Sequence, residues 1–162
     1  MLRVGLGTDL HRVAPGGPLT LGGVTIDWDR HLVGHSDADV LLHAVTDALL
    51  GAAGLDDIGT LFPNTDEANR GRDSAEMLRR AYDAVVDAGW ELMNLDCVVQ
   101  AQAPRIAPFR EPIRRRIAEV LGVDADRVGV KGKTGEGVGT IGREEAIAAT
   151  CVVLLHVPAS AR

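Results

Sequence analysis

Three residues near the N-terminus carry side chains that divalent metal ions prefer: Asp9, His11 and His43. Asp9 and His11 are separated by one residue, and in an extended chain such residues project to the same side, so their carboxylate and imidazole can meet. His43 lies in a segment with helical spacing and could be a third ligand. One carboxylate and two imidazoles suit Zn²⁺ or a similar ion and leave a fourth position for water or substrate. From spacing alone, a polar strand end and an ordinary helix histidine are the simpler interpretation.

His43 has a carboxylate on either side along its predicted helix. Asp39 precedes it by four residues and Asp47 follows it by four, and residues at this spacing share one face of a helix. Metal-bound histidines commonly give their second ring nitrogen to a carboxylate. We therefore expect Asp39 or Asp47 to orient His43.

Two further segments have the composition of an anion site. His35 and Ser36 directly precede the predicted helix, whose first backbone amides have no partner within the helix. The run from Lys131 to Gly137 contains both lysines of the chain and Glu136, so it could hold a diphosphate and a hard cation. The alternatives are a helix cap beside a solvated histidine for the first segment, and a hairpin turn for the second. Neither segment matches a P-loop or a G-x-G-x-x-G motif.

Composition excludes several classes of protein. The net charge is -6 and aromatic residues make up 3%, so the chain lacks the positive charge and the stacking residues of a general nucleic-acid binder. No apolar run approaches the roughly 20 residues of a membrane-spanning helix, and the N-terminus has no signal-peptide pattern. We therefore expect no membrane association and a cytoplasmic location. Cys97 and Cys151 stand in apolar runs, which predicts buried, unpaired thiols.

The elements that must position these residues belong to one domain, which we place at residues 1–158 of the 162, with 159–162 as a short tail. Ser36 and Asp39 have the spacing of a capping box before the first helix. The expected helices are 38–53, 73–89 and 108 or 112 to 122, and the expected strands are 3–7, 19–21, 24–26, 92–102, 127–131 and 146–157. The expected fold class is α/β of the α+β kind, a ferredoxin-like single domain with helices on one face of a mixed, mostly antiparallel sheet.

In their order along the chain, these segments resemble the 2-C-methyl-D-erythritol 2,4-cyclodiphosphate synthase family of the non-mevalonate isoprenoid pathway. The resemblance extends from Arg3 to Val157. It rests on Gly-x-Gly-Thr-Asp9-Leu-His11, the segment from Gly34 to Asp47, Asp57-Ile-Gly59, Leu-Phe62-Pro63-Asn-Thr-Asp66, Ala101-Gln102-Ala103-Pro104-Arg105 and Gly142-Arg143-Glu-Glu-Ala-Ile-Ala.

The resemblance implies roles for individual residues. Asp9, His11 and His43 would bind zinc, and His35 and Thr134 would stabilise the transition state. A second divalent cation, magnesium or manganese, would bind to Glu136 and the substrate diphosphate. The residues that the resemblance assigns to substrate binding are Asp9, His11, His35, Ser36, Asp57, Gly59, Phe62, Asn64, Asp66, Ala101, Ala103, Pro104, Arg105, Lys133, Thr134, Glu136 and Arg143.

The resemblance also implies an assembly and a reaction. Members of the family form a homotrimer with active sites between subunits, so the metal site of one chain would face the cytidine pocket of the next. Arg143 would lie at the trimer axis as the anchor for an isoprenoid diphosphate. The expected reaction closes the small-molecule substrate, a cytidine diphosphate-linked methylerythritol phosphate, into a cyclic diphosphate and releases CMP. Two other functions fit the residues: a regulatory module that binds a cytidine nucleotide without turnover, and a metal-dependent phosphohydrolase.

Overall fold

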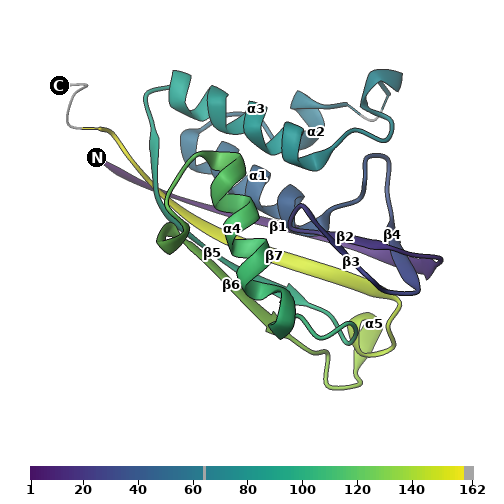
Figure 1. Cartoon of the computed structure of the whole chain (residues 1–162). Helices are drawn as coiled ribbons and strands as arrows, with labels where there is room; N and C mark the ends of the chain where they lie inside the picture. The colour runs from purple at the N-terminus through teal and green to yellow at the C-terminus, as the bar shows by residue number, and fades with distance from the viewer. Residues whose placement is uncertain (64, 159–162) are drawn as a thin grey trace.

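The computed structural model describes residues 1–63 and 65–158, so Asn64 and the expected tail 159–162 lie outside the described residues. The chain forms a mixed α/β domain in which helices cover one face of a sheet (Figure 1). The strands of the sheet are β1 (Leu2–Pro15), β4 (Arg30–Val33), β5 (Glu91–Gln100), β6 (Val128–Lys133) and β7 (Ala146–His156). Their spatial order is β4-β1-β7-β5-β6, and only β5 and β6 pair in parallel.

Three longer helices pack on this face: α1 (Val40–Ala53), α3 (Ser74–Asp87) and α4 (Arg110–Leu121). Two short helices, α2 (Ile58–Leu61) and α5 (Gly139–Gly142), lie in loops, and β2 (Leu19–Leu21) pairs with β3 (Val24–Ile26) in a separate hairpin. The aliphatic core fills the space between the helices and the sheet. Within 1–63 and 65–158, no helix combines the length and the apolar character needed to cross a bilayer.

Two glycines allow α1 to lie directly on β1. A Cβ atom at Gly5 would collide with the backbone oxygen of Ala48, and one at Gly7 would collide with that of Ala44. Side chains alternate along a strand, so Asp9 and His11 project from the same face of β1 as the two glycines. The helix that carries His43 therefore packs against the face of the strand that carries the other two predicted ligands.

The opposite face of β1 is apolar and exposed. Val4, Leu6 and Leu10 are 69%, 64% and 56% exposed, and Val152 of the neighbouring β7 is 45% exposed. Figure 1 shows no helix over this face in the part of the chain that the structure describes. A contiguous apolar surface of this kind is typical of an interface.

Most predicted elements are confirmed, including the hairpin of β2 and β3 and the three longer helices. The ferredoxin-like order is wrong, because the sheet strands and longer helices run β-β-α-α-β-α-β-β (β1, β4, α1, α3, β5, α4, β6, β7) rather than β-α-β-β-α-β. The capping box is also wrong: the N-cap of α1 is Asp39, which accepts from the amide of Leu42, while Ser36 accepts from that of Ala38. Cys97 and Cys151 are buried and free as predicted, side by side on β5 and β7.

Candidate active site

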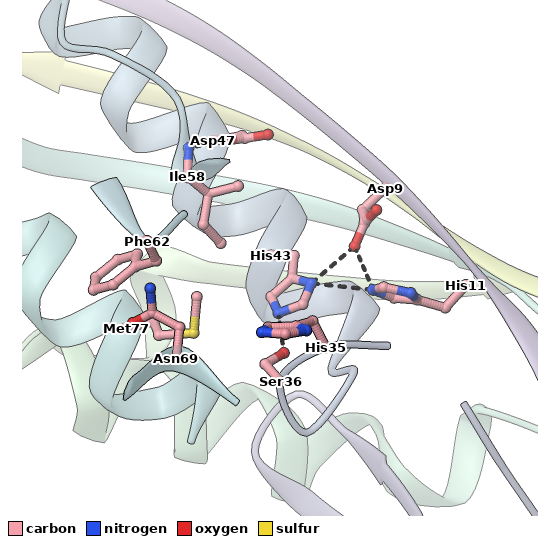
Figure 2. A pocket seen from close by; sticks show the side chains of 10 residues that line it. All are labelled: Asp9, His11, His35, Ser36, His43, Asp47, Ile58, Phe62, Asn69 and Met77. Carbon is pink, nitrogen blue, oxygen red and sulfur yellow. Dashed lines mark hydrogen bonds and ion pairs between the residues drawn. The ribbon is translucent and has the colours of Figure 1, made fainter. Parts of the chain in front are cut away.

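The three predicted metal ligands meet at one point between β1 and α1 (Figure 2). The Oδ2 atom of Asp9 lies 3.0 Å from Nε2 of His11 and 3.0 Å from Nδ1 of His43. The two ring nitrogens are 3.1 Å apart. One carboxylate oxygen and two imidazole nitrogens, all partly buried, form a donor set that a tetrahedral Zn²⁺ ion fits, with one position left open.

Strand β4 fixes the orientation of His11. Its Nδ1 atom lies 3.1 Å from the backbone oxygen of Val33. A carbonyl oxygen can only accept a hydrogen bond, so Nδ1 carries the proton of the neutral ring. When the ring is charged, Nε2 also carries a proton and donates it to Asp9. Loss of that second proton leaves the tautomer that a metal ion requires.

The second nitrogen of His43 contacts hydroxyl groups rather than a carboxylate. Its Nε2 atom lies 3.0 Å from Oγ of Ser36 and 2.9 Å from Oγ of Ser74. The expectation that Asp39 or Asp47 orients this ring is wrong.

The carboxylates of Asp39 and Asp47 instead accept hydrogen bonds from backbone amides. Asp39 accepts from the amides of Gly22, Gly23 and Leu42, and so ties the β2–β3 turn to the start of α1. Asp47 accepts from the amide of Ile58 at 2.9 Å and holds the start of α2. Burial raises the pKa of each above the usual value for aspartate. Both residues therefore position loops around the site.

The charges of the ligand group reinforce each other. Burial alone would raise the pKa of Asp9, but the hydrogen bonds and charges of His11 and His43 lower it far below its usual range. Burial alone would lower the pKa of His11, but the hydrogen bond to Asp9 and its charge raise it. Asp9 therefore stays ionised over the whole physiological range, as a metal ligand must.

A cavity of about 200 Å³ opens beside the ligand group. It is lined by Asp9, His11, His35, Ser36, His43, Asp47, Ile58, Phe62, Asn69 and Met77 (Figure 2). The Nε2 atom of His35 is buried and has no hydrogen-bond partner within the described residues, so a ligand oxygen is a suitable partner for it. Sequence reasoning missed Asn69 and Met77 as lining residues, because only tertiary packing brings them here.

A second cavity, of about 440 Å³, lies where β5 and β6 end. The two strands are parallel and pair Gln100 with Lys133, so the loops that follow them meet at one edge of the sheet. The cavity is lined by Ala101, Gln102, Arg105, Ile106, Ala107, Arg110, Gly132, Lys133 and Thr134. Arg110, at the start of α4, is the lining cation that the sequence did not predict.

The turn after β6 is held against α5. The hydroxyl of Thr134 donates to Glu136 at 2.8 Å, and the amide of Gly137 donates to the side chain of Gln102 at 3.3 Å. A Cβ at Gly135 would collide with the backbone of Gly142, so this turn needs glycine at that position. Among the described residues, Glu136 belongs to no group of three acidic, histidine or cysteine side chains that could hold a metal ion, so a cation bound to it would take its other ligands from the substrate.

Several predicted site residues lie outside both cavities. Asp57 and Asp66 cap short helical turns, where their side chains accept from the amides of Thr60 and Ala68. Arg143 pairs with Glu145 at 2.8 Å. Gly59, Ala103 and Pro104 line neither cavity.

The two predicted catalytic residues are also apart. His35 lines the first cavity and Thr134 the second, and the two cavities share no lining residue. A single chain therefore presents the expected site in two halves.

Comparison with known proteins gives one consistent family. Residues 2–156 match the model of the YgbB family. The 2-C-methyl-D-erythritol 2,4-cyclodiphosphate synthase of Gemmatimonas aurantiaca is 55% identical over 156 residues, covering 95% of this chain and 94% of the relative. The synthase of Shouchella clausii is 52% identical over 156 residues, covering 96% of this chain and 98% of the relative.

Solved structures agree with the sequence comparisons. The bifunctional IspDF of Campylobacter jejuni superposes with a TM-score of 0.96 at 42% identity over 100% of this chain, which spans 44% of the length of that protein. A 2C-methyl-D-erythritol-2,4-cyclodiphosphate synthase in a CDP-bound form superposes with a TM-score of 0.87 at 38% identity, covering 95% of this chain and 100% of the other.

Proposed function

Since the chain belongs to the YgbB family and is an enzyme of its cyclodiphosphate synthase kind, we propose that it converts 4-diphosphocytidyl-2-C-methyl-D-erythritol 2-phosphate to 2-C-methyl-D-erythritol 2,4-cyclodiphosphate and CMP. The observation that carries this proposal is the convergence of Asp9, His11 and His43 beside a cavity with an unpartnered His35 nitrogen. A nucleotide-binding module without turnover needs no such open metal site.

The reaction is an intramolecular phosphoryl transfer. An oxygen of the 2-phosphate attacks the β-phosphorus, the bond from that phosphorus to the bridging oxygen breaks, and CMP leaves with the electron pair. Nucleophile and leaving group belong to one molecule, so the protein has to hold the two phosphates in line and neutralise the developing charge.

Asp9, His11 and His43 would hold a zinc ion, which supplies positive charge to the phosphate oxygens. Glu136 would hold the second divalent cation together with the substrate diphosphate. His35 Nε2, buried and unpartnered within the described part of the chain, is placed to contact a phosphate oxygen. The hydroxyl of Thr134 donates to Glu136 in the structure. With a cation on Glu136, it would donate to the β-phosphate instead, in the transition state and not as a base.

The second cavity suits the nucleotide end of the substrate. Arg105, Arg110 and Lys133 give it three positive charges, which match a diphosphate. We assign the cytidine to Ala101, which lines this cavity, and to Ala103 in the loop that leads away from it.

We propose a homotrimer, because one chain separates His35 from Thr134 and leaves the apolar face of β1 and β7 exposed. Burying that face against neighbouring copies would bring the cavity beside Asp9, His11 and His43 of one chain (the metal half) to the cavity around Lys133 and Thr134 of the next (the nucleotide half). Residues 1–158 would act as a single synthase domain, working in the cytoplasm without nucleic acid or membrane.

Phosphorus NMR of the product tests the reaction. We expect two coupled resonances of a cyclic diphosphate together with CMP, and no turnover after treatment with a chelator. An open-chain product would identify a phosphohydrolase, and binding of CDP without any product would identify a regulatory module.

A further inference from the structure

Ser74, the first residue of α3, lies directly behind the metal ligand His43. Its side chain is fully buried, at 0% exposure, so it cannot touch a substrate. Its Oγ atom lies 2.9 Å from Nε2 of His43 and also donates to Oδ1 of Asp37 in a short hydrogen bond. The backbone amide of Ser74 donates to the other oxygen of Asp37 at 3.1 Å.

These contacts determine where the protons lie. A carboxylate can only accept, so the single hydroxyl proton of Ser74 points at Asp37. The oxygen of Ser74 then faces His43 as an acceptor and favours a ring proton on Nε2. The other nitrogen, Nδ1, lies 3.0 Å from Oδ2 of Asp9, which attracts a ring proton to Nδ1 when no metal is bound. Ser74 therefore acts against Asp9 and favours the form in which Nδ1 keeps its lone pair where the ligand atoms meet.

Ser36, the other hydroxyl on Nε2, does not impose this choice. Its Oγ accepts from the amide of Ala38 at 3.2 Å, and no carboxylate holds its proton within the described residues. Ser36 can therefore accept from His43 or donate to it. Without Ser74, donation from Ser36 would favour the tautomer with the proton on Nδ1, which cannot bind a metal ion.

We infer that Ser74, oriented by Asp37, is a positioning residue that keeps His43 in the tautomer with a free Nδ1. The inference rests on the metal site proposed above. Ser74 and Asp37 act on His43 as the carbonyl of Val33 acts on His11, so each imidazole ligand has its own partner that fixes its proton. Partners of this kind typically contribute about 10–100-fold to metal affinity.

The test compares Ser74→Ala with a matched control on the same helix. Asp73→Ala removes the N-cap of α3, a bond to the amide of Ala75 at 2.8 Å, without touching His43. Zinc affinity is measured by competition with a chelator, and the tautomer of His43 by ¹⁵N NMR of the metal-free protein. We expect Ser74→Ala to weaken zinc binding about 10–100-fold and to shift the ring proton from Nε2 toward Nδ1. Asp73→Ala should lower the melting temperature and leave both readouts unchanged.

Asp37→Asn serves as a second, nearly isosteric variant. An amide group can donate to Oγ of Ser74 and release the hydroxyl proton toward His43, so we expect a weaker shift in the same direction. Wild-type affinity and an unchanged tautomer in Ser74→Ala would overturn the inference, as would equal losses in Ser74→Ala and Asp73→Ala. Absence of zinc from the wild type would instead overturn the proposed metal site, while the tautomer of the metal-free protein would still decide the role of Ser74.

Discussion

In the cavity around His43, protein groups already hold the candidate ligand atoms in place, whereas in the cavity around Lys133 the cations have no partner among the described residues. His11 and His43 each contact a second partner, and Asp9 lies between them. Arg105, Arg110 and Lys133 have neither an ion pair nor a side-chain hydrogen bond to any residue that the structure describes. If the proposed function holds, the chain preorganises the residues that would bind the metal ion, and leaves the cations of the second cavity free to be paired by the substrate diphosphate.

The strongest test of this comparison removes the metal half alone. His43→Ala deletes one of three ligands, so we expect loss of zinc and a fall in kcat/KM of more than about 10³-fold. Affinity for CDP should stay within about threefold, because the nucleotide cavity shares no lining residue with His43. Elemental analysis, CMP release and calorimetry measure these quantities. Full zinc content in the variant would remove His43 from the site.

The second test separates charge stabilisation from binding in the nucleotide half. If the Thr134 hydroxyl contacts oxygens that gain charge in the transition state, Thr134→Ala should lower kcat by about 10²-fold with little change in KM. Lys133→Ala should mainly raise KM, because it removes binding common to substrate and transition state. Thr134→Ser keeps the hydroxyl and is the control, since Thr134 also bonds Glu136. A change in KM alone for Thr134→Ala would contradict the transition-state role.

The third test uses pH to probe the metal half. A metal ligand must be deprotonated, and the pKa of His11 in the metal-free protein lies above its usual value because of Asp9. Zinc affinity should therefore fall as the pH drops through this raised pKa, by about tenfold per unit, starting above the ordinary histidine value of about 6.5. Protonation of Asp9 should not weaken zinc binding until strongly acidic pH, because the pKa of Asp9 is lowered. Affinity measured by chelator competition that stays constant from about pH 8 to pH 5 would be inconsistent with ligation by His11.

The test with the smallest expected effect asks whether the metal half of one chain and the nucleotide half of another form one active site. A mixture of His43→Ala and Glu136→Ala subunits should regain a minor part of wild-type activity, because some interfaces combine an intact metal half with an intact nucleotide half. Each variant incubated alone is the control. Fully active monomers in light scattering, or no recovery in verified hybrid trimers, would show that one chain builds the site by itself.

Strand alternation and helical spacing made Asp9, His11 and His43 candidate ligands, but spacing alone favoured a polar strand end and an ordinary helix histidine. The resemblance to the synthase family assigned them to zinc. The structure brings them together because α1 lies on β1. Asp39 and Asp47 were misjudged because helical spacing does not reveal that backbone amides occupy their carboxylates.

Other features depend on contacts distant in sequence. Ser74 reaches His43 from α3, 31 residues away along the chain, and no local pattern signals it. The ferredoxin-like expectation was wrong for the same reason, since the position of β7 between β1 and β5 leaves no trace in the sequence of either strand. Strand β4, with four residues, was too short to show alternation.

Anomalous diffraction at the zinc edge, from crystals of the protein as purified, tests the central claim most directly. The account predicts one peak per chain within bonding distance of Asp9 Oδ2, His11 Nε2 and His43 Nδ1, about 2.0–2.2 Å from each, with a fourth position free of protein. Crystals that contain zinc by fluorescence but show the peak elsewhere, or with a fourth protein ligand closing the site, would contradict it.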